Sequence, residues 1–381
     1  TRSDGSLPRM CGSQMFRRMQ AGAITFDDEQ LAHIDKAQCV ECGKCAEVCP
    51  YSAITNFKRP CERACKVDAI HMAKDGVATI DSEKCISCGA CVYQCPFGAT
   101  LDVSSITDVI KNNEKFKVYA VVAPAIASQF TYAKTGQIIT AIKEVGFYGV
   151  EEAALGADIV AYNEAEELQE RELMTSSCCP AFVQYIKTNF PDMAQYISEN
   201  LSPMAEAGKL LKKYDPDCKV VFIGPCTAKK AEIRDPKVVQ YIDYVLTFEE
   251  LQALIDSKDI EVENLPETDL STASPFGRNF ARSGGVADAV TEAVKERSGD
   301  AVKVDPIVCD GIDQCKSALM RASRGVLPNN FIEGMVCDGG CIGGAACLTH
   351  VDKANRKKIE AYGISAKIKE IQTAVEQANN R

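Results

Sequence analysis

A run of four cysteines with fixed spacing occurs twice in this chain and constrains it more than any other feature. The two runs begin 46 residues apart, share the pattern Cys-x2-Cys-x2-Cys-x3-Cys-Pro, and cover residues 39–50 and 85–96. This spacing lets one short loop supply three thiolates to a [4Fe–4S] cube, while the fourth cysteine reaches the cube of the other run. We therefore predict two clusters. The expected ligands are Cys39, Cys42, Cys45 and Cys95 for the first, and Cys85, Cys88, Cys91 and Cys49 for the second.

Twenty cysteines among 381 residues also fit other interpretations. Disulfide frameworks are typical of small secreted domains, whereas this chain is long and its first 20 residues lack the apolar core of a secretory signal. Structural zinc is the alternative for either run, but two complete copies, each followed by proline, favour clusters. Reduced thiols predict a cytoplasmic protein. No apolar run approaches the ~18–20 residues that span a bilayer.

The 46-residue repeat extends further back along the chain. Met15-x3-Met19 lies 46 residues before Cys61-x3-Cys65, so methionine occupies the earlier copy where the later copy has cysteine. Cys61 and Cys65 therefore form half a ligand set. We interpret them as relics or buried thiols rather than as part of a further cluster.

Cysteine density divides the chain into regions. Residues 1–38 are predicted to be an N-terminal segment with a degenerate half repeat, and 39–100 an α+β ferredoxin-like domain of the bacterial two-[4Fe–4S] type. Residues 101–115 are expected to be a linker. The region 116–381 alternates strand-like and helix-like stretches, which predicts an α/β domain. Its clearest predicted strands are 118–123, 218–224 and 331–336, and its clearest helices are 137–146, 283–296 and 313–322.

Three cysteine motifs lie in the α/β region, far apart in the sequence. They are Ser176-Ser177-Cys178-Cys179-Pro180-Ala181-Phe182, Gly224-Pro225-Cys226-Thr227-Ala228-Lys229-Lys230-Ala231-Glu232, and Glu333-Gly334-Met335-Val336-Cys337-Asp338-Gly339-Gly340-Cys341-Ile342-Gly343-Gly344. Two of them directly follow predicted strands, where open α/β sheets place ligands. Together they supply four thiolates, enough for one more [4Fe–4S] cube between two lobes. The glycines around Cys341 remove side chains where a bulky group must approach its sulfur.

These motifs resemble the three active-site signatures of the [FeFe]-hydrogenases, in the same order. The resemblance covers about residues 39–381 and implies a two-lobed α/β catalytic domain over 116–381, the H-cluster domain. The H-cluster of this family joins a [4Fe–4S] cube through a cysteine sulfur to a two-iron unit that carries carbon monoxide, cyanide and a bridging dithiolate amine. The implied activity is the reversible reaction of 2H⁺ and two electrons to H2.

The resemblance also implies roles for individual residues. Cys179, Cys226, Cys337 and Cys341 would ligate the cube, with Cys341 bridging to the two-iron unit and Pro225 beside the cofactor. Cys178 would exchange protons with the bridging amine, and a thiol with an ordinary pKa near ~8.5 suits that task. Lys229 would donate a charge-assisted hydrogen bond to a cyanide.

An outer proton relay is a further implication. Glu164, Glu167 and Arg171 match the relay segment of the family, and Ser198 matches its relay serine. Taken alone, the stretch 163–171 would rather indicate a solvated acidic helix face, and that alternative stays open.

Several positions depart from the family pattern. Gly224 replaces methionine, Ala181-Phe182 replaces Gly-Trp, Ala125 replaces a serine near a cyanide, and Met204 replaces a polar residue. The chain therefore resembles a less-studied subgroup with weaker hydrogen bonding around the cofactor, and such surroundings tune a metal site.

Other functions compete with the hydrogenase hypothesis. A non-catalytic relative that assembles iron–sulfur clusters needs neither the Cys178 thiol nor the Lys229 ammonium, and both are present. A hydrogen sensor would carry a signalling domain, and no segment resembles one. A simple electron-transfer ferredoxin leaves the three later motifs without a purpose.

Charge bears on the partners. The net charge of −10 argues against nucleic acid as a partner. A basic stretch beside the cysteine runs is either an ordinary solvated loop or a steering surface for an acidic ferredoxin or flavodoxin. It contains Lys58, Arg59, Arg63 and Lys66. The resemblance also implies dedicated maturation proteins as partners.

The remaining cysteines give weaker signals. Cys218 is predicted to lie in a strand. Packing is at least as good an interpretation as metal ligation for Cys309 and Cys315. For Cys347 and His350 we favour packed helix residues over a metal site.

Overall fold

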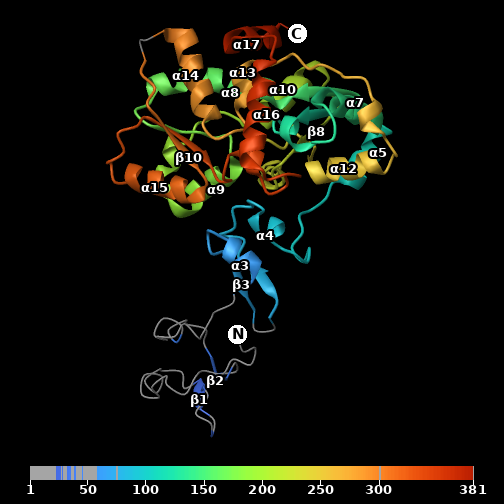
Figure 1. The fold of residues 1–381 in the computed structure, drawn as a ribbon. Helices are drawn as coiled ribbons and strands as arrows, with labels where there is room; N and C mark the ends of the chain where they lie inside the picture. Colours follow the sequence, from blue (N-terminus) through green and yellow to red (C-terminus); the bar gives the residue numbers. More distant parts are fainter. Residues whose placement is uncertain are drawn as a thin grey trace. The chain divides into compact units, whose positions relative to one another are not determined.

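The computed structural model describes residues 23–26, 28, 32–35, 38–39, 45, 58–73, 76–299 and 302–380. The chain divides into two units, Thr1–Arg63 and Ala64–Arg381 (Figure 1). In the first unit, strand β1 (Ile24–Phe26) pairs antiparallel with β2 (Ala32–Ile34).

Several predictions for the first unit fall on residues outside the described ranges. Cys42 and Cys49 are among them, as are Met15 and Met19 and most of the predicted N-terminal segment. The first predicted ligand set, and the place of Cys49 in the second, therefore stay predictions.

The second unit begins with the later half of the ferredoxin-like region. Helix α3 (Pro60–Ala64) leads into it, and strands β3 (Ile70–Met72) and β4 (Ala78–Ile80) form an antiparallel hairpin. The loop after β4 carries the second cysteine run and enters the short helix α4 (Ala90–Tyr93). Ser87 and Gly89 adopt positive φ angles of 57° and 78°, which bend this loop back on itself.

A four-stranded parallel sheet forms the first lobe of the α/β region. Its order is β6-β5-β8-β9. The strands are β5 (Val118–Val122), β6 (Gly149–Glu152), β8 (Lys219–Gly224) and β9 (Tyr244–Thr247). Strands of a parallel sheet covered on both faces are apolar almost throughout, which is why VYAVV and KVVFIG could be recognised as strands.

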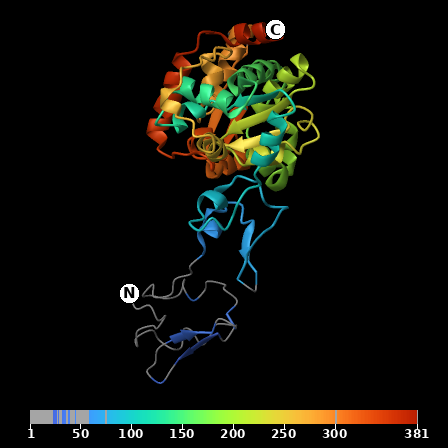
Figure 2. The same cartoon turned by 90° about the vertical axis from the view of Figure 1, so that its right-hand side faces the viewer.

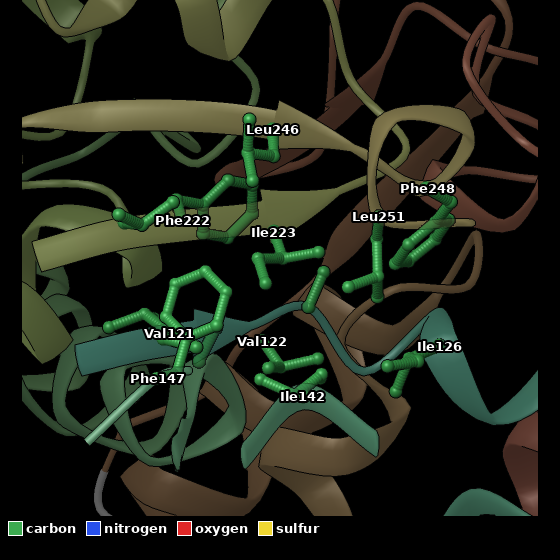
Figure 3. Close-up of a cluster of buried hydrophobic side chains, with 14 of the residues drawn as sticks. Val121, Val122, Ile126, Ile142, Phe147, Phe222, Ile223, Leu246, Phe248 and Leu251 are labelled. Carbon is green, nitrogen blue, oxygen red and sulfur yellow. The ribbon is translucent and has the colours of Figure 1, made fainter. Parts of the chain in front are cut away.

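Helices bury the apolar side chains of this sheet. Figure 3 shows Val122 and Ile223 from the strands lying near Ile142 and Leu251 from the helices. The helices of this lobe are α6 (Ile126–Gln129), α7 (Thr135–Val145), α10 (Pro203–Tyr214), α11 (Ala228–Glu232) and α12 (Phe248–Asp256). Thr247 caps α12 by accepting from the Glu250 backbone N–H at 3.1 Å, while the Glu250 carboxylate accepts from the Thr247 N–H at 2.7 Å.

A three-stranded parallel sheet forms the second lobe. Its order is β10-β11-β7. The strands are β7 (Met174–Thr175), β10 (Pro306–Asp310) and β11 (Phe331–Met335), and the helices packed on them are α9 (Pro180–Asn189), α14 (Gly285–Ser298) and α15 (Ile312–Ala322). Figure 2 shows the strands of the α/β region lying within a surround of helices.

Helix α8 (Ala153–Glu167) packs against helices of both lobes, α10 and α14 among them. It is buried along most of its length, and a Cβ at Gly156 would collide with the backbone carbonyl of Pro203 on α10. Three further helices cover this region: α13 (Pro275–Asn279), α16 (Asp352–Ile364) and α17 (Ile371–Asn379). Short 3-10 helices occupy Leu168–Glu170, Pro191–Tyr196, Val262–Asn264 and Cys341–Gly343.

A buried ion pair joins these covering helices to the sheet. The Arg278 guanidinium on α13 donates to the Glu152 carboxylate at 2.8 Å, and the Tyr362 hydroxyl on α16 donates to the same carboxylate at 2.6 Å. A buried pair of this kind is costly to break, because removal of one partner leaves an uncompensated charge.

The predicted fold class is confirmed, and each predicted strand and helix of the α/β region is present to within a few residues. The prediction of a linker over residues 101–115 does not hold for most of that segment. Its residues 106–113 form helix α5 (Ile106–Asn113), and Val109 is fully buried in the core of the four-stranded lobe. In the described part of the chain, no helix has the length and apolar character needed to cross a membrane.

Candidate functional site

The three cysteine motifs of the α/β region begin at the carboxyl ends of strands. Strand β7 ends at Thr175, just before the first motif, and β8 ends at Gly224, two residues before Cys226. Strand β11 ends at Met335, two residues before Cys337. Because carboxyl ends of parallel strands share one edge of a sheet, each lobe delivers its cysteines at that edge.

The thiols of Cys179, Cys226, Cys337 and Cys341 lie close enough to influence one another. Burial raises the pKa of Cys226 to about 11, and the neighbouring Cys179 contributes in the same direction. Burial also raises the pKa of Cys337 well above its usual range, with further contributions from Cys226, Cys179 and Cys341. Thiols from three remote segments therefore lie near one another.

The donor chemistry fits a [4Fe–4S] cube. The four groups are all thiols, the ligands that iron–sulfur clusters take, and they come from both lobes. Among the described residues, no three His, Cys, Asp or Glu side chains form a group that could hold a single metal ion.

Two glycines of the third motif have a packing role. A Cβ on Gly344 would lie 2.5 Å from the Pro225 carbonyl oxygen, and the Ala346 N–H donates to that same oxygen at 3.1 Å. A Cβ on Gly343 would collide with the Asp338 carbonyl. Gly343 and Gly344 thus allow the third motif to pack backbone-to-backbone on the second and to fold tightly on itself.

A pocket lies beside Cys178 and Cys341. Its walls are mostly apolar and include Met204, Phe280 and Pro225. Lys229 is the one charged side chain among the residues that line it. A small apolar chamber with a single ammonium suits an anionic ligand such as cyanide, because the charge acts in a medium of low dielectric constant.

Lys229 is held rigidly in this pocket. It is 7% exposed, its ammonium donates to the Cys178 carbonyl at 3.2 Å, and it forms an ion pair with Glu232 at 2.6 Å. Burial acts to lower the pKa of Lys229, but the Glu232 carboxylate outweighs this effect and raises it. The side chain therefore stays charged.

Cys178 is buried next to a carboxyl group that has no obvious structural role. Burial raises the pKa of the Cys178 thiol well above its usual value, and the neighbouring Glu164 raises it further. Glu164 lies on α8 with 0% exposure, and within the described structure neither of its carboxylate oxygens has a hydrogen-bond partner. Buried polar groups are nearly always satisfied, so an exception of this kind points to function.

The pKa of Glu164 is raised to about 8. Burial is the main cause; the nearby Ser198 hydroxyl lowers the value and the Glu167 carboxylate raises it. A carboxyl group with this pKa can gain or lose a proton close to neutral pH.

Three of the predicted outer relay residues, Ser198, Glu167 and Arg171, form a line of hydrogen bonds and ion pairs that ends at the surface. The Ser198 hydroxyl donates to Glu167 Oε2 at 2.9 Å, and Arg171 pairs with Glu167 at 2.9 Å. Arg171 also pairs with Glu199, whose side chain is 81% exposed. The alternative of a solvated acidic helix face does not fit Glu164, which is fully buried.

One polar residue of this line was not predicted. The Asn200 amide donates to Glu167 Oε2 at 2.7 Å and to the Ser198 hydroxyl at 3.1 Å. It lies two residues after Ser198, and no motif in the sequence distinguishes it from an ordinary loop asparagine.

Glu333 of the third motif has a structural role that was also missed. Its carboxylate accepts from the backbone N–H groups of Gly284 and Ala287, both at 2.7 Å, at the start of α14. A carboxylate there satisfies free N–H groups and complements the helix dipole. Burial raises its pKa to about 7.

Packing accounts for two of the unusual positions in the motifs. A Cβ on Gly224 would lie 2.6 Å from the Phe222 ring and 3.0 Å from the Ala123 methyl, so no larger residue fits there. Phe182 is fully buried against Gly334, where any Cβ would collide with the Phe182 ring.

The later cysteine run lies directly against the α/β region. The Thr227 hydroxyl donates to the Ser87 carbonyl at 2.9 Å, and a Cβ on Gly89 would come within 3 Å of both Thr227 and Ala345. Burial raises the pKa of Cys88, and the nearby thiols of Cys65, Cys85 and Cys179 contribute. Cys88 thus lies between the ferredoxin-like thiols and the predicted cube.

The remaining cysteines pack as interior residues. Cys218, Cys309 and Cys315 are 0–1% exposed. The Cys347 thiol donates to the Ile342 carbonyl at 3.3 Å, and the His350 ring stacks on Tyr93 with a centroid distance of 4.1 Å. These contacts favour packing over metal ligation, but Cys347 and His350 lie in the loop before α16 rather than in the expected helix.

Fold and site together define an iron–sulfur protein with a thiol-lined centre between two parallel α/β lobes. The family of the iron-only hydrogenase large subunit, C-terminal domain, matches residues 116–345, and the 4Fe-4S binding domain family matches residues 32–55 and 78–99. The chain therefore belongs to the iron-only, or [FeFe], hydrogenase family. This membership supports iron–sulfur clusters and an H-cluster as its cofactors.

Two hydrogenases are among its similar relatives. Iron hydrogenase 1 of Clostridium pasteurianum is 28% identical over 88% of this chain and 68% of the relative. The periplasmic [Fe] hydrogenase large subunit of Nitratidesulfovibrio vulgaris is 28% identical over 84% of this chain and 86% of the relative. One relative is periplasmic by name, so the cytoplasmic location expected for this chain stays a prediction.

Solved structures agree on the fold. [FeFe]-hydrogenase HydA1 from Chlamydomonas reinhardtii aligns with a TM-score of 0.57 and 18% identity, covering 73% of this chain and 94% of the other. A different kind of relative is also similar: the cytosolic Fe-S cluster assembly factor NAR1 of Kluyveromyces lactis is 23% identical over 50% of this chain and 55% of the relative.

Proposed function

We propose that this chain is a catalytic [FeFe]-hydrogenase that interconverts 2H⁺ and two electrons with H2. The observation that carries the proposal is the buried line from Cys178 through Glu164 to Ser198 and Glu167, which starts at the pocket beside Cys341. A protein that only carries or assembles clusters has no use for an unpartnered buried carboxyl group beside a thiol.

The cofactor would be held by residues of all three motifs. Cys179, Cys226, Cys337 and Cys341 would ligate the cube, with Cys341 shared with a two-iron unit that carries carbon monoxide, cyanide and a dithiolate amine. When bound, this group supplies the iron centre at which protons and electrons combine. Lys229 would hold a cyanide by a charge-assisted hydrogen bond, and Pro225 and Met204 would exclude water from the pocket.

Cys178 would carry protons at its sulfur. Burial raises the pKa of Cys178, so the thiol form is favoured. This thiol could donate a proton into the pocket and then receive another from the Glu164 side. Glu164, with a pKa of about 8, would supply that proton from its carboxyl group. Ser198 and Glu167 would connect Glu164 to solvent beside Arg171. H2 oxidation would use the same groups in the opposite direction.

Electrons would enter through the ferredoxin-type clusters. The loop that carries Cys88 packs on Thr227 and Ala345, and this packing would bring its cluster next to the cube. A small ferredoxin or flavodoxin is the proposed partner, steered by the basic stretch 58–66. Lys58 and Arg59 are exposed there, whereas Lys66 is already paired with Asp313 at 2.9 Å.

The second candidate function is iron–sulfur cluster assembly, which the likeness to NAR1 supports. Infrared spectroscopy of protein matured anaerobically with hydrogenase maturation proteins separates the two. We expect bands of bound carbon monoxide and cyanide together with H2 evolution from a reduced ferredoxin. Protein that contains its cubes but shows neither bands nor H2 evolution would reject catalysis in favour of assembly.

A further inference from the structure

Cys65 and Cys95 occupy the same kind of turn. Each closely follows a short helix, α3 before Cys65 and α4 before Cys95. The third residue after each cysteine has a positive φ, 50° at Asp68 and 60° at Gly98, and its N–H donates to the cysteine carbonyl at 3.3 Å. The fold thus repeats locally at a 30-residue offset that differs from the 46-residue repeat of the sequence.

The two sulfurs also have the same hydrogen-bond donor. The Ala69 N–H donates to Cys65 Sγ at 3.2 Å, and the Ala99 N–H donates to Cys95 Sγ at 3.2 Å. Backbone N–H groups directed at sulfur stabilise a thiolate and are a feature of iron–sulfur ligation. Cys95 is the fourth cysteine of its run, so Cys65 has the backbone geometry of a fourth ferredoxin cysteine.

The β3–β4 hairpin brings Cys65 to the second run. Ile70 pairs with Ile80, and the Asp81 N–H donates to the Ala69 carbonyl at 2.7 Å. The chain therefore returns beside Cys65 four residues before it reaches Cys85. One pocket is lined by the four thiols together with apolar side chains such as Ile70 and Val92. The thiols are Cys65, Cys85, Cys88 and Cys91.

We propose that Cys65 is the fourth ligand of the [4Fe–4S] cluster that Cys85, Cys88 and Cys91 hold. In this arrangement four thiolates complete the coordination of one cube without Cys49. The matched ferredoxin segments, 32–55 and 78–99, do not include Cys65. The assignment concerns an electron-transfer cluster and holds whether the chain makes H2 or assembles clusters.

The change of ligand has a physical advantage. Cys65 lies 20 positions before Cys85, and a paired hairpin occupies most of that interval. A ligand delivered by a short, structured loop loses less chain entropy on cluster binding than one delivered from Cys49, which lies 36 residues away. The cluster nearest to the predicted cube is thereby held within the second unit.

The test compares four variants of the full chain, purified anaerobically: Cys65→Ala, Cys85→Ala, Cys49→Ala and the double variant Cys65→Ala/Cys85→Ala. Iron and acid-labile sulfide are counted, and electron paramagnetic resonance of the reduced protein identifies which cluster is lost. We expect Cys65→Ala and Cys85→Ala to lose the same signal and about four irons each, with no further loss in the double variant. Cys49→Ala should keep that signal. Retention of the signal in Cys65→Ala, with its loss in Cys49→Ala, would overturn the assignment.

A measurement on the unmodified chain avoids any folding defect of the variants. Native protein is alkylated under anaerobic conditions while iron is withdrawn stepwise by a chelator, and labelled cysteines are identified by mass spectrometry. Cys65 should become labelled together with Cys85, Cys88 and Cys91 as this cluster is lost. Cys218, which is 1% exposed, serves as the control and should stay unlabelled. Labelling of Cys65 while Cys85 is still protected would contradict the proposal.

Discussion

The Cys95 turn of the ferredoxin-like segment and the buried site of the α/β region act on cysteine in opposite ways, whereas Cys88 and Cys91 resemble the buried site because burial raises their pKa values. In the ferredoxin-like segment, backbone N–H groups of residues 97–100 lower the pKa of Cys95. In the α/β region, burial raises the pKa of Cys226 and Cys337, so these thiols hold their protons in the absence of metal. Loading the buried site must therefore release protons, whereas the Cys95 turn favours the thiolate beforehand.

This difference teaches how each kind of site is built. A cluster loop needs only a turn and a few N–H donors, so a short sequence can encode it. The buried site needs two sheets to bring remote strand ends together, and it gains a dry pocket in which single charges act strongly. Substitutions in the two regions can test this contrast.

The largest expected effect is that of Cys178→Ala. If the buried thiol transfers protons, H2 evolution should fall by about 10³–10⁴-fold, while iron content and infrared bands stay unchanged. Cys218→Ala, at a buried thiol outside the pocket, is the matched control and should keep its activity. Full turnover in Cys178→Ala would show that protons take another route.

Glu164→Gln is expected to lower H2 evolution by about 10²-fold. The same variant also tests whether the pKa of the Glu164 carboxyl group is raised. Because the carboxyl titrates near 4.5 when unfolded and near 8 when folded, the folded state binds the extra proton, and stability falls as pH rises between these values. The variant should lack this decline, which amounts to at most about 1.4 kcal/mol per pH unit.

The urea concentration at the midpoint of unfolding is measured from pH 5 to pH 8 for Glu164→Gln and for the unmodified protein, and the two values are subtracted at each pH. The subtraction removes the contributions of Asp158 and Glu333 to the pH dependence of stability, because both residues are present in the two proteins. Their pKa values are raised to about 7. Glu166→Gln is the control, since the Glu166 side chain is 67% exposed and pairs with Arg297. Equal pH slopes in Glu164→Gln and the unmodified protein would mean that Glu164 is ionised in the fold.

Lys229→Ala should lower the occupancy of the two-iron unit by roughly ten-fold while the cubes remain. Infrared band intensity per chain, compared with iron content, measures this. Lys230→Ala is the matched control, because Lys230 pairs with Asp102 and Glu250 and does not line the pocket. Undiminished bands in Lys229→Ala would exclude a role in holding cyanide.

The smallest effect is expected at the contact between the two regions. Gly89→Ala places a methyl group against Thr227 and Ala345 at a positive φ and should cost about 1–3 kcal/mol of unfolding free energy. Gly98→Ala has a positive φ but nothing within 4 Å, so it should cost about 1 kcal/mol. Calorimetry measures both. Equal losses would indicate that the Cys88 loop is not tightly packed on the α/β region.

Much of the site could be predicted because its signals are local. Cysteine spacing indicated the clusters, and continuous apolar runs such as 118–123 indicated parallel strands. The sequence could not decide between a proton relay and a solvated helix face for residues 163–171. Nothing in EAEELQER distinguishes the buried Glu164 from the exposed Glu166. Asn200 and the capping role of Glu333 depend on contacts with residues 33 to 49 positions away and left no pattern to recognise.

By itself the amino-acid sequence determined the α/β architecture and the thiols available for iron, since strand patterning and ligand spacing act over a few residues. Only the tertiary structure decided which residues meet: Glu164 behind Cys178, Pro225 under the glycines of the third motif, and Cys65 beside Cys85. The reason is physical. Burial and proximity arise when helices and strands distant in sequence pack together, and the pKa values and contacts of this site follow from that packing.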